Sequence, residues 1–75
     1  MVRLFIDKGK KDGLHLKLFL RELSRQTGVK ENNFHNIQLS PQYSFVDVAA
    51  DTSKKILKNK AIKLNSKPTK IELAT

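Results

Sequence analysis

Three aromatic side chains occupy alternating positions in two β-rich segments, and flat rings on a sheet surface suit one kind of chemistry. Phe5 lies in the segment 2–6, and Tyr43 and Phe45 lie in the segment 43–48. Successive side chains of a strand point to opposite faces, so the aliphatic residues take one face and the three rings take the other. Clustered exposed rings need an explanation, and stacking of nucleic-acid bases supplies one.

Cations surround these segments. The chain carries 15 Lys+Arg against 7 Asp+Glu, a formal net charge of +8. The stretch 8–13 combines two glycines with three lysines and predicts a mobile basic loop, which either keeps the protein soluble or wraps phosphates. A second basic tract supplies a more general positive field and consists of Lys54, Lys55, Lys58, Lys60, Lys63, Lys67 and Lys70.

The residue types argue against catalysis and against a bound metal. His15 and His35 are the only histidines, they lack metal-ligand spacing, and the chain has no cysteine. The lysine- and glycine-rich loop lacks the spacing of a phosphate-binding P-loop. No strand-to-helix elbow presents a nucleophile. We therefore expect a non-catalytic domain with no cofactor and no metal.

Length and hydropathy limit the architecture. With 75 residues and 8.6 kDa, the chain is expected to form a single domain over residues 1–75 with a thin core. No apolar run approaches the roughly 20 residues of a membrane span. The N-terminus reaches Asp7 too early for a secretory signal. The sequence therefore predicts a soluble, cytoplasmic domain.

Hydrophobic periodicity predicts the first half of the fold. Residues 2–6 alternate as a half-buried strand, with Val2, Leu4 and Ile6 inward. A helix follows, with a core stripe at i, i+3, i+4 and i+7 and a glycine at its C-terminus. The stripe is Leu16, Phe19, Leu20 and Leu23, the terminal glycine is Gly28, and the opposite face carries Lys17, Arg21 and Arg25.

The second half of the sequence predicts strands before and after a second helix. A strand over 36–40, with Ile37 and Leu39 inward, and a strand over 43–48 are separated by a turn at 41–42. Asp51 is the expected N-cap of a helix over 52–58. A short extended stretch at 61–64 and a turn at 65–68 precede a last strand over 69–73, with Ile71 and Leu73 inward.

This order predicts an α+β fold with β-α-β-β-α-β topology, in which two helices cover one face of a four-stranded antiparallel sheet. The first and third strands are then antiparallel neighbours. If Phe5 lies opposite Phe45, the same register places Arg3 opposite Asp47 and Asp7 opposite Tyr43. Arg3 and Asp47 are most simply a cross-strand ion pair worth under about 1 kcal/mol.

The stretch 41–48, Pro-Gln-Tyr-Ser-Phe-Val-Asp-Val, resembles the longer signature of an RRM domain, K/R-G-F/Y-G/A-F-V-x-F/Y. Its two outward aromatics match, whereas the leading basic residue and glycine do not. The chain as a whole resembles the DbpA-like RNA-binding domain. The resemblance is carried by this stretch and by the strand and basic loop over 2–13, and it covers nearly the whole chain. That RRM-like module lies at the C-terminal end of certain bacterial DEAD-box RNA helicases.

The resemblance implies a domain that tethers an ATP-dependent helicase motor, with ATP binding and hydrolysis in the parent protein, to structured and often ribosomal RNA. We expect the helicase core domains in the same chain as partners, and no membrane. The residues expected to contact RNA are Arg3, Phe5, Lys8, Lys10, Lys11, Tyr43 and Phe45. The alternative is an RRM-like protein-interaction module, which would use the same sheet face or Leu18, a leucine outside the helix stripe.

Overall fold

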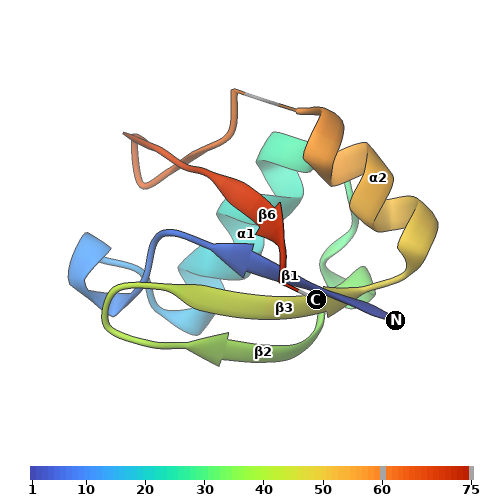
Figure 1. Ribbon diagram of the computed structural model, residues 1–75. Helices are drawn as coiled ribbons and strands as arrows, with labels where there is room; N and C mark the ends of the chain where they lie inside the picture. The colour runs from blue at the N-terminus through green and yellow to red at the C-terminus, as the bar shows by residue number, and fades with distance from the viewer. Residues whose placement is uncertain (60, 75) are drawn as a thin grey trace.

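The computed structural model describes residues 1–59 and 61–74, and its main elements follow the expected β-α-β-β-α-β order (Figure 1). These elements are β1 (Val2–Ile6), α1 (Leu16–Thr27), β2 (His35–Leu39), β3 (Ser44–Val48), α2 (Ala50–Lys58) and β6 (Ile71–Leu73). Shorter pieces are the 3₁₀ turns η1 (Lys10–Asp12) and η2 (Glu31–Asn33) and the strands β4 (Lys63–Leu64) and β5 (Lys67–Pro68). The α+β fold class is confirmed.

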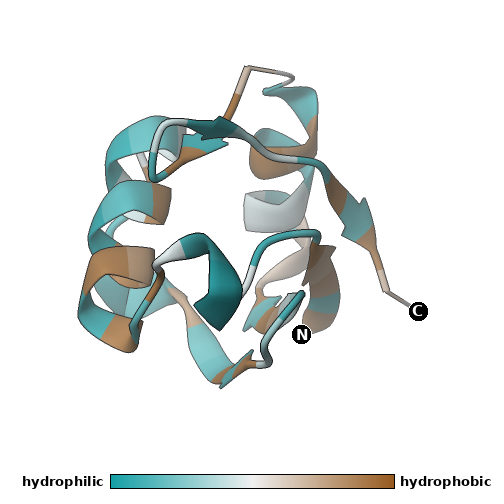
Figure 2. Ribbon diagram, turned by 90° about the vertical axis from the view of Figure 1, so that its left-hand side faces the viewer, coloured by the Kyte–Doolittle hydropathy of each residue, from teal (hydrophilic) through white to brown (hydrophobic). Residues whose placement is uncertain are grey.

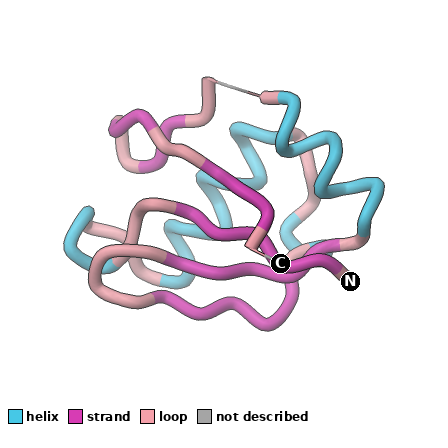
Figure 3. Tube along the Cα trace, in the orientation of Figure 1, coloured by secondary structure: helices cyan, strands magenta, loops and turns pink. Residues whose placement is uncertain are grey.

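The main sheet has the strand order β2-β3-β1-β6, and each neighbouring pair is antiparallel. The strands β4 and β5 form a separate two-stranded hairpin beside this sheet, which Figure 3 shows as short strand segments away from the four longer ones. The sequence indicated only an extended stretch and a turn there. The predicted last strand is shorter than expected because Thr69 bonds back to Ile62 instead of joining the sheet.

Alternation along the central strands builds the core. Leu4 and Ile6 of β1 and Val46 and Val48 of β3 are fully buried on the helix-covered face. They pack with buried residues of both helices and of the hairpin, chiefly Phe19, Leu23, Ile56 and Leu64. The rings of the 2–6 and 43–48 segments therefore lie on the opposite face, as the alternation predicts.

The first helix has a wider buried surface than its predicted stripe. Phe19 and Leu23 are buried, and Gly28 ends the helix with φ = 74°, as expected. Leu16, however, is 53 % exposed, and Leu14 enters the core from the segment before the helix. Leu18, which lies outside the predicted stripe, is half-buried and packs against the core.

The predicted N-cap of the second helix is wrong, and one side chain at a strand end is more exposed than an inward position suggests. The N-cap of α2 is Ala49, and Asp51 lies inside the first turn, where its carboxylate accepts the N–H of Thr52 at 2.9 Å. Leu73 lies opposite the buried Leu4 and therefore shares its inward face, as predicted, but its side chain is 50 % exposed because β6 is the edge strand of the sheet.

Within the described residues, no helix has the length and apolarity that crossing a membrane requires. In residues 1–59 and 61–74, no group of three or more His, Asp or Glu side chains is arranged to hold a metal ion.

Candidate nucleic-acid interface

The three predicted rings form one cluster on the face of the sheet that the helices leave uncovered. The ring centroids of Phe5 and Tyr43 are 5.9 Å apart, and each lies 5.6 Å from that of Phe45. The Phe5 and Tyr43 planes are inclined by 29°, whereas Phe45 meets them at 63° and 72°. Tyr43 is 42 % exposed and the two phenylalanines are half-buried against their neighbours. We call this cluster the aromatic platform.

The register that creates the platform was predicted from alternation and is confirmed. Phe5 lies opposite Phe45, and Arg3 lies opposite Asp47. The β1–β3 pairing ends at Ile6 and Ser44, so the expected position of Asp7 opposite Tyr43 falls outside the ladder. Asp7 instead accepts the backbone N–H of Lys70 at 2.9 Å, on the other side of β1.

Arg3 is held over one edge of the platform by three contacts. Its Nη1 donates to Oδ1 of Asp47 at 2.8 Å, and its Nη2 donates to Oε1 of Gln38 at 2.7 Å. Its guanidinium carbon lies 5.1 Å from the centroid of the Phe45 ring, within cation–π range. The guanidinium is therefore fixed in position before any ligand arrives.

Asp47 connects this arginine to β2. Its Oδ2 accepts a 2.9 Å hydrogen bond from Nδ2 of Asn36, a residue with φ = 48° at the irregular register of the β2–β3 pair. The hydrogen bond from Asn36, followed by that from Arg3, lowers the pKa of Asp47, although partial desolvation opposes them. Asp47 is therefore ionised at neutral pH and acts as an acceptor for both neighbours. No sequence pattern indicated the Gln38 and Asn36 contacts.

The basic loop is pinned to the fold, contrary to the prediction that it is mobile. The N–H groups of Lys10 and Lys11 donate to the carbonyls of Ser40 and Pro41 at 2.9 and 2.8 Å. Gly9 makes this approach possible, because a Cβ there would lie 2.1 Å from the Ser40 oxygen. The loop therefore lies directly on the β2–β3 turn that leads into Tyr43.

Asp12 joins the loop to the β4–β5 hairpin. Its Oδ2 accepts the N–H of Gly9 at 2.9 Å, and its Oδ1 pairs with Nζ of Lys67 at 3.3 Å. Its backbone carbonyl accepts Nδ2 of Asn65 at 2.8 Å. The Gly9 hydrogen bond, aided by the Lys67 contact, lowers the pKa of Asp12, although partial desolvation opposes it. The loop, the β2–β3 turn and the hairpin thus share one end of the molecule, which faces the viewer in Figure 2, where η1 is strongly hydrophilic.

The three predicted loop cations differ in their availability. The Lys8 side chain is 16 % exposed, and its Nζ lies 3.3 Å from Oδ1 of Asp7. Lys10 and Lys11 are exposed, and neither side chain makes an ion pair or hydrogen bond with another described residue. The charge that a ligand can reach at this loop therefore belongs mainly to Lys10 and Lys11.

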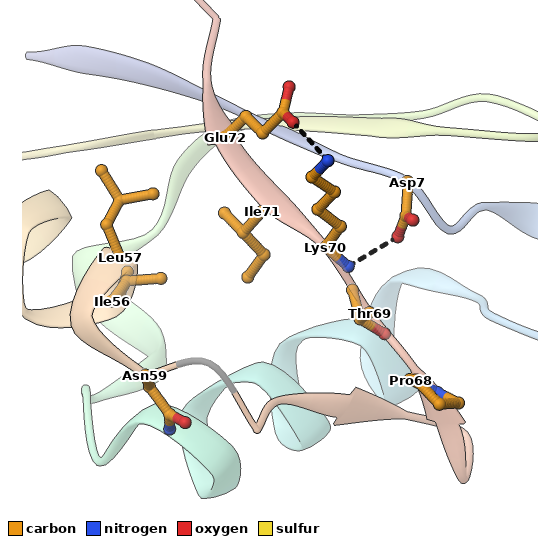
Figure 4. A pocket seen from close by; sticks show the side chains of 9 residues that line it. All are labelled: Asp7, Ile56, Leu57, Asn59, Pro68, Thr69, Lys70, Ile71 and Glu72. Carbon is orange, nitrogen blue, oxygen red and sulfur yellow. Dashed lines mark hydrogen bonds and ion pairs between the residues drawn. The ribbon is translucent and has the colours of Figure 1, made fainter.

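A separate groove of about 490 Å³ runs between the C-terminal half of α2 and β6 (Figure 4). Its apolar side is formed by Ile56, Leu57 and Ile71. Its rim carries Lys70, whose Nζ pairs with Oε1 of Glu72 at 3.2 Å. The groove lies at the sheet edge and its lining residues come from distant segments, so sequence patterns did not reveal it.

A four-stranded antiparallel sheet with both helices on one face and a ring cluster on the other has the architecture of RRM-like nucleic-acid-binding domains. The model of the DbpA RNA binding domain family matches residues 3–73, and the chain belongs to this family. No curated protein is similar enough to the chain to be matched to it. Membership in this family supports an RNA-binding role, and a domain of this kind is non-catalytic by itself.

Proposed function

We propose that this domain, taken as one unit over residues 1–75, is the RNA-tethering module of an ATP-dependent DEAD-box RNA helicase in the cytoplasm. It holds structured RNA, ribosomal RNA being the first candidate, close to the motor domains of the same chain. A tether raises the local concentration of RNA at the motor without forming a new contact there.

The observation that carries the RNA-binding part of the proposal is the aromatic platform. Its three rings lie within 6 Å of one another on an uncovered sheet face. The loop that carries the exposed Lys10 and Lys11 is hydrogen-bonded to the β2–β3 turn that leads into Tyr43. Base stacking on such rings contributes about 1–3 kcal/mol per base, and lysines beside them release counterions from phosphates. A net charge of +8 favours the same ligand.

The proposed contacts divide by chemistry. Phe5, Tyr43 and Phe45 stack bases, and Lys10 and Lys11 bind phosphates. Lys8 supports the start of the loop, where its carbonyl accepts a hydrogen bond from the buried Ser44 hydroxyl at 2.6 Å. Arg3 contacts a base at the margin of the platform.

Charge reversal at the loop tests the phosphate contacts. Lys10→Glu together with Lys11→Glu is compared with Lys54→Glu together with Lys55→Glu, an equal charge change on the exposed face of α2. We expect the loop pair to weaken binding to an RNA hairpin and to reduce the slope of log affinity against log salt by about 2, one ion for each phosphate that is no longer neutralised. The helix pair changes only the general field and has the smaller effect.

Fluorescence anisotropy with a labelled hairpin from ribosomal RNA, measured over a range of salt concentrations, gives both quantities. If the two double variants had equal effects, the loop would not be part of the RNA-binding surface. If the wild type and a platform variant bound every RNA with equal affinity, the proposal that the aromatic platform binds RNA would be wrong.

The motor-tethering part has a separate test. ATP hydrolysis by the full-length protein is measured with RNA that contains a hairpin bound by this domain and with RNA that lacks the hairpin. We expect stimulation at lower RNA concentration in the first case, and deletion of this domain abolishes the difference. Indistinguishable stimulation curves for the full-length protein would contradict tethering.

The protein-interaction alternative loses one of its two supports. Leu18, which was to dock a partner, packs against the core of the domain itself. The sheet face remains, and binding of a peptide to it would depend weakly on salt, whereas RNA binding depends strongly on it. The salt series above therefore distinguishes the two functions.

A further inference from the structure

The edge strand β6 leaves part of its backbone unpaired. The carbonyl of Lys70 accepts the N–H of Asp7 at 3.1 Å, which places Lys70 at a bonded position of the β1–β6 ladder. Bonded positions alternate along an antiparallel ladder, so the N–H and C=O groups of Ile71 and Leu73 point away from β1. Within the described residues these groups have no hydrogen-bond partner, because β6 is the last strand of the sheet. Such a row of groups is a template for a further strand.

The apolar groove lies beside this unpaired edge, on the side of the sheet that faces α2 (Figure 4). Its apolar lining comes from Ile56 and Leu57 of α2 and from Ile71 of β6. Leu73 shares the inward face, and its side chain is 50 % exposed. A strand added to β6 would therefore satisfy the backbone groups of the edge and cover these apolar side chains at the same time.

The pairing geometry determines which residues of an added antiparallel strand enter the groove. Residues directly opposite each other in a sheet share a face, so the residues opposite Ile71 and Leu73 would point toward α2. The same two residues would exchange N–H···O bonds with β6, whereas the residue between them would direct its N–H away from it. The groove therefore favours a segment with apolar side chains at two alternate positions.

Exposed cations border the groove on its α2 side. Lys54 lies three residues before Leu57, and Lys58 lies four residues after Lys54, so the two lysines form a row along the helix next to Leu57. Both are exposed, and neither side chain makes an ion pair with another residue that the structure describes.

The two acids among the residues that line the groove are already engaged. Glu72 pairs with Nζ of Lys70 at 3.2 Å. Asp7 accepts the backbone N–H of Lys70 at 2.9 Å and lies 3.3 Å from Nζ of Lys8. The border thus presents positive charge that these acids do not neutralise, which favours a partner with acidic residues.

We propose that the β6 edge and this groove form a docking site for an extended segment of a partner protein. The segment carries two apolar residues at alternate positions, flanked by acidic residues, and adds a strand to the sheet. This site goes beyond RNA binding, because it uses neither the aromatic platform nor the basic loop. RNA has no row of backbone amides to pair with β6, and a second copy of the domain would bring its own charge of +8 against the same border.

Titration of the isotope-labelled domain with a synthetic peptide tests the proposal. The probe is a short peptide with two valines at alternate positions, glutamates on both sides of them and threonine elsewhere. We expect the amide signals of Ile71 and Leu73 to shift as the peptide saturates the domain, and that of Tyr43 to stay in place. A peptide with serine in place of both valines should not bind detectably.

Methylation of the peptide backbone separates strand addition from simple apolar contact, and it leaves the protein unchanged. N-methylation of the two valines removes the N–H groups that face β6 and should weaken binding about tenfold or more, the effect of two lost hydrogen bonds. N-methylation of the threonine between them removes an N–H that faces away, so the affinity should stay nearly unchanged.

Two double variants test the charge at the border. Lys54→Glu together with Lys58→Glu should weaken binding of the glutamate peptide about fivefold, as expected for two exposed ion pairs. Lys30→Glu together with Lys55→Glu is the matched control, because these exposed lysines line a different hollow beside Asp51. The control pair should have the smaller effect.

Four results would overturn the docking site. They are equal losses from the two methylated peptides, equal losses from the two double variants, no shift at Ile71 and Leu73 at any peptide concentration, and self-association of the domain through β6. Shifts at the same two amides on addition of an RNA hairpin in place of the peptide would assign the edge to RNA and would also overturn it.

Discussion

The backbone N–H of Gly9 donates a 2.9 Å hydrogen bond to the Asp12 carboxylate, and this one contact closes the basic loop on itself. The second oxygen of the same carboxylate pairs with Lys67 of the hairpin. A single acidic residue among many lysines therefore holds two separate segments in register with each other.

Gly9→Ala should destabilise the domain by about 1–3 kcal/mol, because the new Cβ would overlap the Ser40 carbonyl and force the loop off the β2–β3 turn. Urea denaturation followed by circular dichroism gives the free energy of unfolding. Gly28→Ala is the control. Its φ of 74° costs about 1–2 kcal/mol, but its Cβ would meet nothing within 4 Å. The amide chemical shifts of Ser40 and Tyr43 should move only in Gly9→Ala, and unchanged shifts would contradict the close approach.

Asp12→Asn should reduce stability at neutral pH and have less effect in acid. The pKa of Asp12 is lowered in the folded state, so its contribution is fully present above the unfolded pKa near 4 and is lost as the pH falls through the lower folded value. Urea denaturation of both proteins between pH 7 and pH 2.5 measures the difference. A gap that stays constant over this range would show that the charge of Asp12 is not what holds the loop.

Tyr43→Ala should weaken RNA binding by about 1–3 kcal/mol, the contribution of one stacked base, with little effect on folding. The ring is 42 % exposed, so its removal leaves no cavity in the core. Tyr43→Phe is the conservative control and should bind nearly as the wild type does. Titration of a labelled RNA hairpin gives both affinities. Equal losses in the two variants would assign the contribution to the hydroxyl rather than to the ring.

Leu18→Ala should cost about 1–3 kcal/mol of stability, whereas Leu16→Ala should change it by less than about 0.5 kcal/mol. The two residues lie two positions apart on α1, but Leu18 packs against the core and Leu16 is 53 % exposed. Thermal denaturation of both variants compares them under one condition. The reverse order of stabilities would restore the stripe that the sequence periodicity predicts.

The sequence predicted those parts of the candidate site whose positions depend only on the alternation of side chains along a strand. The positions of Phe5 and Phe45 follow from a period of two and one antiparallel pairing, and both the register and the uncovered face are as expected. The Arg3–Asp47 pair follows from the same register. Whether these residues bind RNA stays a prediction.

The remaining features depend on contacts between segments that are distant in the chain. Gly9 lies against Ser40, and Asp12 against Asn65 and Lys67, and no periodicity connects such positions. Likewise, Leu14 rather than Leu16 fills the core, because the preceding segment enters the core before the helix begins. Local patterns specify which face a residue occupies, but they do not specify which other segment covers it.

The seating of the basic loop on the β2–β3 turn has a mechanical consequence. The backbone N–H groups of Lys10 and Lys11 donate to the carbonyls of the turn that leads into Tyr43, so a force applied to either lysine would reach that turn through these hydrogen bonds. A strand of polynucleotide under tension would load the cationic and aromatic contacts together instead of peeling them away one at a time. Detachment would then require both sets of contacts to break together, which would slow dissociation.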